Sequence, residues 1–189
     1  MLDRAIGAFT FRRGVYKEVE EDATFTTTAW VLVIVVAFLN QLGSYVSGNV
    51  VGWLMGAILG TVGVVIGFAV AAFVVQWVGR ALFKADVTFE EMVRTLGLAY
   101  VWNVVGVLGV LAFVPALGCL LAPVVFIAGI LGLIAWFVAA KEALDLDWVP
   151  TIVTVIIGWI VLVVITLVVG ALLGLLGVGA GALRGLLPV

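Results

Sequence analysis

The sequence contains no histidine and a single cysteine, Cys119, among its 189 residues. Histidine is the most common general base and a frequent metal ligand, so its absence removes the simplest catalytic and metal-binding designs. One cysteine cannot form an internal disulfide. The HExxH motif, a GxSxG motif with a partner histidine, and the P-loop are also absent. We therefore expect no catalytic site, no cofactor and no metal centre, and predict that the protein is not an enzyme.

Charge is also scarce, at 11% of residues, and it is distributed unevenly. With the exception of Arg184, the charged residues are confined to three clusters, 1–22, 80–94 and 141–147. The segments between and after them carry no charge before Arg184: 23–79, 95–140 and 148–183. A charge at the centre of a bilayer costs about 3 kcal/mol, which explains such long exclusions. The net charge of −2 and the lack of a basic patch exclude a nucleic-acid partner.

The charge-free segments predict membrane-spanning helices. A helix needs about 20 apolar residues to cross roughly 30 Å of hydrocarbon, so each of the first two segments must fold back. Polar residues and glycines near 41–52 mark one turn, and Pro115 to Gly118 with Pro123 mark the other, where we expect both prolines to end helices. The predicted fold is an all-α, polytopic membrane bundle with five spans, at 26–45, 53–78, 97–114, 120–140 and 151–173.

Two hairpins place all three charged clusters on one side of the membrane. The basic residues on that side are Arg4, Arg12, Arg13, Lys17, Arg80, Lys84, Arg94 and Lys141. The other side has only Arg184. The positive-inside rule then places the N-terminal segment 1–25 in the cytoplasm and the glycine-rich tail 174–189 outside. We expect a multi-pass protein of the cell membrane.

The second charged cluster has the pattern of a helix start. Thr88 and Glu91 fit a capping box, in which each side chain satisfies a backbone amide of the first turn. Apolar residues then recur at helical spacing, and Glu90 is placed to pair with Arg94. We predict a short amphipathic helix that leads into the third span.

The N-terminal segment is less regular. Leu2, Ile6 and Phe9 share one helix face, which could lie among lipid headgroups or dock on the other loops. The acidic run Glu18, Glu20, Glu21 and Asp22 could recruit a basic partner or form a solvated face. The carboxylates Glu142, Asp145 and Asp147 fit a solvated loop better than a cation site. The candidate face for an unknown cytoplasmic partner comprises Arg12, Arg13, Tyr16, Glu20, Asp22, Glu90, Glu91 and Arg94.

Glycines recur every four residues in the turn before the second span and in its first part. They are Gly48, Gly52, Gly56 and Gly60. This spacing puts small residues on one helix face and lets backbones approach closely. The face could serve packing within one bundle or form the interface of a homo-oligomer.

Polar residues within the spans are few, and none is ionisable. The main candidates are Asn40, Gln76 and Asn103. A proton or cation pump normally needs a buried ionisable group in mid-membrane, so that class is excluded. The amides could form hydrogen bonds between helices, or they could line a path for a neutral solute or lipid.

Three stretches of the sequence resemble the Yip1 domain family of five-span membrane proteins. They are Phe11 to Asp22 before the first span, Thr88 to Tyr100 before the third, and Lys141 to Leu144 before the last. The excess of arginine over lysine and of acidic over basic residues favours a prokaryotic member. The resemblance implies a non-enzymatic membrane protein that organises the membrane or recruits partners through its cytoplasmic face. The alternative function is a small channel or transporter for a neutral solute or lipid.

Overall fold

The computed structural model describes residues 2–44 and 49–175, and all secondary structure in these ranges is helical. The elements are α1 (Leu2–Phe9), α2 (Val15–Glu21), α3 (Phe25–Ser44), α4 (Val50–Phe83), α5 (Phe89–Ala99), the 3₁₀ helix η1 (Tyr100–Phe113), α6 (Pro115–Leu144) and α7 (Trp148–Leu175). Five helical segments are long and apolar enough to cross a membrane, with α5 and η1 counted together as one. The predicted all-α class and the number of spans are confirmed.

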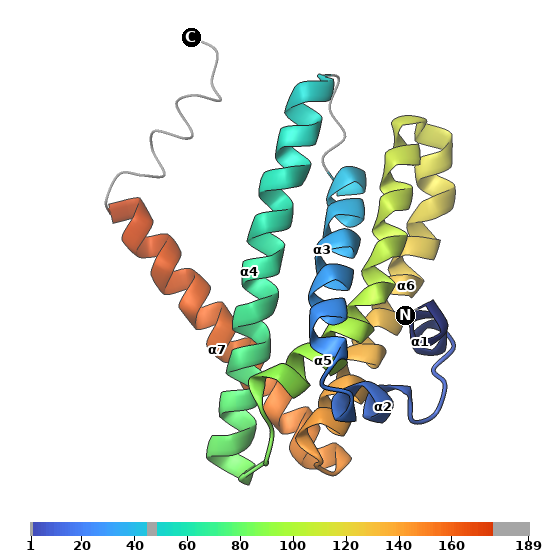
Figure 1. Cartoon of the computed structure of the whole chain (residues 1–189). Coiled ribbons are helices and arrows are strands. Elements are labelled where there is room, and N and C mark those ends of the chain that lie inside the picture. The colour runs from blue at the N-terminus through green and yellow to red at the C-terminus, as the bar shows by residue number, and fades with distance from the viewer. Residues whose placement is uncertain (1, 45–48, 176–189) are drawn as a thin grey trace.

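The long helices form a bundle that carries the short helices at one end. Helices α3, α4, η1 and α6 run side by side, and α7 meets α4 near this end and leans away from it further on (Figure 1). Helices α1, α2 and α5 pack across the same end, and we call it the charged end and its opposite the apolar end. The main hydrophobic core lies at the charged end, where it joins residues such as Val19 of α2, Met92 of α5 and Leu144 of α6.

The third span is a 3₁₀ helix along most of its length. A 3₁₀ helix rises about 2.0 Å per residue, so its 14 residues reach about 28 Å. An α-helix with the same number of residues would reach only about 21 Å. Side chains three residues apart eclipse each other in a 3₁₀ helix, which aligns Asn103, Gly106 and Gly109 on one face. Sequence reasoning considered glycines four residues apart and missed this three-residue pattern.

This aligned face lets η1 pack backbone to backbone against α3. A Cβ atom on Gly109 would lie 2.5 Å from the carbonyl oxygen of Gly43, and one on Gly106 would collide with the amide of Asn40. Asn40 also donates from Nδ2 to the carbonyl oxygen of Asn103 at 2.8 Å. Glycine is therefore required where the two helices cross.

The two prolines of the second hairpin have different roles. Pro115 lies just after the end of η1, as predicted, and it is also the first residue of α6, a position that favours proline. Pro123 was expected to end a helix, and this expectation is wrong because Pro123 lies inside α6. Its ring removes one hydrogen bond to the carbonyl of Cys119. Ending the helix in an apolar surrounding would instead leave several backbone groups unsatisfied, so the helix continues.

Candidate functional site

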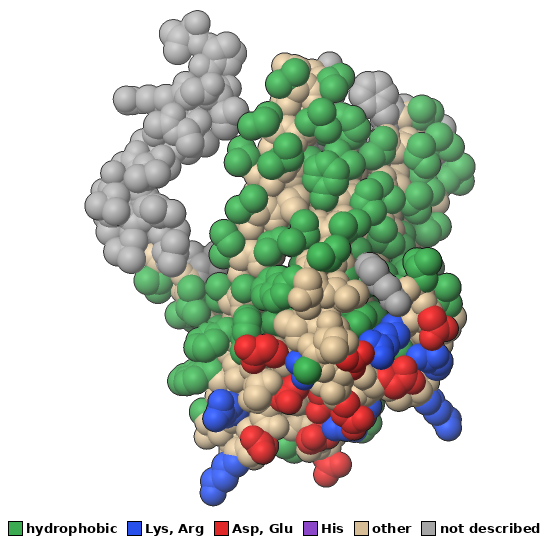
Figure 2. All heavy atoms as spheres, viewed as in Figure 1, with side chains coloured by type: hydrophobic (Ala, Val, Ile, Leu, Met, Phe, Trp, Pro, Cys, Tyr) green, Lys and Arg blue, Asp and Glu red, His purple; other side chains and the backbone are tan. Residues whose placement is uncertain are grey.

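The three charged clusters, far apart in sequence, form one layer at the charged end. Figure 2 shows acidic and basic side chains gathered there, while hydrophobic side chains cover the rest of the visible face. Lys17 of α2 pairs with Asp145 after α6 at 3.0 Å, and Arg4 of α1 pairs with Asp22 at 2.7 Å. We call α1, α2, α5 and the last turn of α6 with Asp145 the charged cap.

Arg94 of α5 is the most buried cation of the cap, with 6% of its surface exposed. Its Nε donates to the carbonyl oxygen of Glu20 at 3.0 Å, and one terminal nitrogen donates to the hydroxyl of Thr26 at 3.2 Å. Arg94 thus satisfies the carbonyl of Glu20 in the last turn of α2 and joins α2, α3 and α5. Contrary to the prediction, Glu90 does not pair with Arg94. Glu90 is exposed, and Arg94 turns inward, 3.9 Å from Glu91.

The predicted capping box at the start of α5 is confirmed. The backbone nitrogen of Thr88 donates to Glu91 Oε2 at 2.7 Å, and the nitrogen of Glu91 donates to the Thr88 hydroxyl at 3.2 Å. This box fixes where α5 begins. The helix then buries a continuous segment from Met92 to Ala99.

Burial and pairing shift several ionisation equilibria in the cap. Burial raises the pKa of Glu20, against an opposing hydrogen bond from Lys17. The hydrogen bond to Asp145 is the main cause that raises the pKa of Lys17. Hydrogen bonds from the Thr24 hydroxyl and from Arg4 lower the pKa of Asp22. Most charges of the cap are therefore engaged in holding its helices together.

One part of the cap is different, because it leaves polar groups available. A hollow of about 300 Å³, the cap hollow, is lined by Phe11, Arg12, Arg13, Gly14, Tyr16, Val138 and Glu142. Arg12 is held by Asp3 at 3.1 Å and by Glu18 at 2.8 Å. Arg13 is exposed and has no ion pair among the described residues.

Tyr16 adds a second available group to the cap hollow. The residue is 3% exposed, and its hydroxyl has no hydrogen-bond partner in the part of the chain that the structure describes. Burial raises the pKa of Tyr16 well above its ordinary value, so the hydroxyl stays protonated at neutral pH. It therefore keeps a proton that no acceptor among the described residues takes up.

The predicted partner face separates into two sets. Arg12, Arg13 and Tyr16 line the cap hollow. Glu20, Asp22, Glu91 and Arg94 make contacts within the cap, whereas Glu90 is exposed. Sequence patterns alone could not separate these sets, because an internal contact and a free charge look the same in a sequence.

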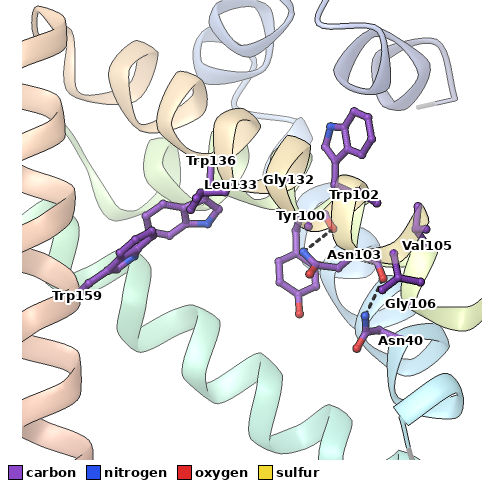
Figure 3. A pocket seen from close by; sticks show the side chains of 13 residues that line it. Asn40, Tyr100, Trp102, Asn103, Val105, Gly106, Gly132, Leu133, Trp136 and Trp159 are labelled. Carbon is purple, nitrogen blue, oxygen red and sulfur yellow. Dashed lines mark hydrogen bonds between the residues drawn. The ribbon is translucent and has the colours of Figure 1, made fainter. Parts of the chain in front are cut away.

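A second hollow lies between the spans. This membrane groove, of about 320 Å³, is lined by Asn40, Tyr100, Trp102, Asn103, Val105, Gly106, Val125, Ala128, Gly129, Gly132, Leu133, Trp136 and Trp159 (Figure 3). The structure brings the predicted polar residues Asn40 and Asn103 together here. Gln76 lies elsewhere, where its Nε2 donates to the carbonyl oxygen of Val87 at 3.1 Å and fixes the connection after α4.

The four predicted glycines do not all share one environment. Gly60 packs against α3, where a Cβ atom would collide with the side-chain amide of Gln41. Gly52 lies beside its own helix cap, where an added Cβ atom would come within 3.8 Å of Asn49, and Gly56 is half-buried. Gly48 lies outside the described residues. At least the Gly60 end of this face serves packing within the chain.

The carboxylates Glu142, Asp145 and Asp147, at and after the end of α6, show no arrangement suited to a metal. No group of three or more His, Cys, Asp or Glu side chains among residues 2–44 and 49–175 is placed to hold an ion. Lys141 lies 3.7 Å from Glu142, and Asp145 pairs with Lys17.

Comparison with known proteins gives one match. A model of the Yip1 domain family matches residues 6–183, which include all five candidate spans and all of the charged cap except the start of α1. Neither the curated proteins nor the solved structures gave a match.

Proposed function

Because the chain belongs to the Yip1 domain family, which is not a known enzyme family, we propose that this multi-pass membrane protein recruits a partner and catalyses no reaction. The recruiting surface is the charged cap, and the contact point is the cap hollow. The observation that carries the proposal is the pair formed by exposed Arg13 and the buried, unpartnered hydroxyl of Tyr16.

The chemistry of the cap hollow favours an acidic side chain of a partner protein. An unsatisfied buried donor costs about 1–3 kcal/mol, so an acceptor placed beside Tyr16 would recover that cost. A guanidinium such as Arg13 binds carboxylates through paired hydrogen bonds. A partner segment that presents Asp or Glu would pair with exposed Arg13, and its carboxylate would bring an acceptor to the hollow that Tyr16 also lines.

The predicted orientation puts this surface in the cytoplasm of the cell. Eight basic residues lie in the three charged clusters, and the positive-inside rule retains such residues on the cytoplasmic side. The partner would then be a cytoplasmic protein held at the cell membrane, and its recruitment would organise that membrane region.

Crosslinking in intact cells tests the recruitment. We expect the amount of crosslinked adduct between the full-length protein and its partner to fall about tenfold or more in the variants Arg13→Glu and Tyr16→Phe. Each change removes one charged or hydrogen-bonding contact. Arg80→Glu is the matched control, because Arg80 is exposed on α4 and does not line the cap hollow. Adducts that persist in both variants, or that fall equally in the control, would count against the proposal.

Labelling of Cys119 tests the orientation separately. Its side chain is exposed near the start of α6, at the apolar end. A membrane-impermeant maleimide should modify it from outside the cell. Modification only from the cytoplasmic side would place the cap outside and overturn cytoplasmic recruitment.

The alternative, transport of a neutral solute or lipid, has less support. A path was expected to include Asn40, Gln76 and Asn103, but Gln76 lies apart from the membrane groove. The groove fits a binding site better than a passage.

A further inference from the structure

The membrane groove presents three polar atoms that have no hydrogen-bond partner among the described residues, namely Oδ1 of Asn40, Oδ1 of Asn103 and the hydroxyl oxygen of Tyr100. Asn40 and Asn103 each use their Nδ2 donor on a backbone carbonyl, that of Asn103 at 2.8 Å and that of Tyr100 at 3.2 Å. Each amide therefore keeps a free Oδ1 acceptor. The hydroxyl of Tyr100 can both donate and accept, and Figure 3 shows it on the same side of the groove as the two amides.

The remaining walls are apolar and leave room for a molecule. The rings of Trp136 and Trp159 lie 6.0 Å apart between their centroids and close one side of the groove. On α6, a Cβ atom at Gly129 would meet no atom within 4 Å. The volume of about 320 Å³ falls at the lower end of the range for small-molecule sites, which is roughly 300–1,000 Å³.

The available groups restrict the chemistry of an occupant. Among the described residues, no Lys, Arg, Asp or Glu lines the groove, so a charged ligand would find no counter-ion from them in a low-dielectric site. Two amide oxygens require donors, and a phosphate diester offers only acceptors. A free hydroxyl fits, because it can donate to an amide oxygen and accept from Tyr100.

We propose that the membrane groove binds the uncharged, hydroxyl-bearing head of a membrane lipid, and that Asn40, Asn103 and Tyr100 hold the hydroxyl. The lipid chain lies along Trp136 and Trp159. The occupant comes from the bilayer, because the groove lies between membrane-spanning helices and unmet polar groups there are costly. This site goes beyond the recruitment proposed for the charged cap and does not depend on it.

Photolabelling of the full chain in lipid nanodiscs tests the site. The probes are a photoactivatable diacylglycerol and a photoactivatable phosphatidylcholine with the same acyl chains. We expect the diacylglycerol probe to label peptides of η1 and α6 several times more strongly. Asn103→Leu and Tyr100→Phe should each lower that labelling about fivefold, as the loss of one hydrogen bond predicts.

A second variant keeps the test independent of these polar groups. Gly129→Leu fills the groove and leaves Asn40, Asn103 and Tyr100 in place, so it should abolish labelling by the diacylglycerol probe. Gly63→Leu is the matched control, because a Cβ atom there also meets nothing within 4 Å but Gly63 does not line the groove. Equal labelling by the two probes, or full labelling of Gly129→Leu, would overturn the proposal.

Discussion

At the charged end every residue from Met92 to Ala99 is buried, whereas on α6 the side chains from Val124 to Ile127 are between 37% and 69% exposed. The first segment contains a buried arginine and the second is wholly apolar. In a soluble protein these environments would be reversed. The difference indicates that the bilayer covers the apolar side chains, while the charged end must form its own core.

The two ends are therefore held by different contacts. Side-chain hydrogen bonds, ion pairs and a hydrophobic core join the helices of the charged cap. Further along the bundle, glycines bring the backbones of α3 and η1 together. Lipid tails are as apolar as leucine, so close packing replaces the hydrophobic effect within the bilayer. Changes at the two ends should then destabilise the protein for different reasons.

The largest loss is expected from Arg94→Leu. It leaves the carbonyl oxygen of Glu20 without its buried donor and should lower the free energy of unfolding by about 3 kcal/mol. Unfolding by SDS titration in detergent measures this change. The control Arg80→Leu, at an exposed position, should change stability little. Equal losses in the two variants would mean that the cap does not depend on its buried arginine.

The next largest loss is expected from Gly106→Val, further along the bundle. The added side chain collides with Asn40 and separates η1 from α3, at a cost of about 2 kcal/mol for overpacking. The same titration applies. Gly67→Val is the control, since a Cβ atom at Gly67 meets nothing within 4 Å. A tolerated Gly106→Val would contradict close backbone packing as the force that joins these helices.

A smaller loss is expected from Thr88→Ala, which removes one half of the capping box. The cost should be about 1 kcal/mol, as for other N-cap replacements, and should appear as fraying of α5 in amide hydrogen exchange. Thr27→Ala, at an exposed position within α3, should leave the exchange of α5 unchanged.

The smallest effect is expected from Lys17→Met at the exposed edge of the cap. The pKa of Lys17 is raised above 10.5 in the folded state, so its pairing stabilises the fold below that pH and is lost as the pH rises above it. The difference in Tm between wild type and variant should therefore stay constant from about pH 8 to about pH 10 and shrink as the pH rises above 10.5. A difference that stays constant above pH 10.5 would show that Lys17 acts through packing and not through its charge.

Patterns that depend on local chemistry could be predicted from the sequence. Charge exclusion identified the membrane class and five spans, because the cost of a charge in lipid acts on every residue. The capping box at Thr88 and Glu91 was also predicted, since its two partners lie three residues apart. The partner of Arg94 was not, because Glu20 is far from it in sequence and accepts through its backbone.

The membrane groove could be predicted only in part. Asn40 and Asn103 were selected as polar residues in spans, but their meeting depends on η1 being a 3₁₀ helix. Hydropathy does not distinguish a 3₁₀ helix from an α-helix. Tyr100 and the glycines of α6 were not selected from the sequence, because the groove that they share exists only once the spans are packed together.

The geometry of η1 also sets how this region can change in evolution. Each residue of a 3₁₀ helix turns the chain by about 120°, so the helix has three separate faces. One face carries Asn103, Gly106 and Gly109 toward α3, and a neighbouring face carries Trp102 toward Gly132 of α6. Inserting or deleting a single residue would exchange these faces. We therefore expect η1 to keep its length, and to accept substitutions only away from the glycines that meet α3.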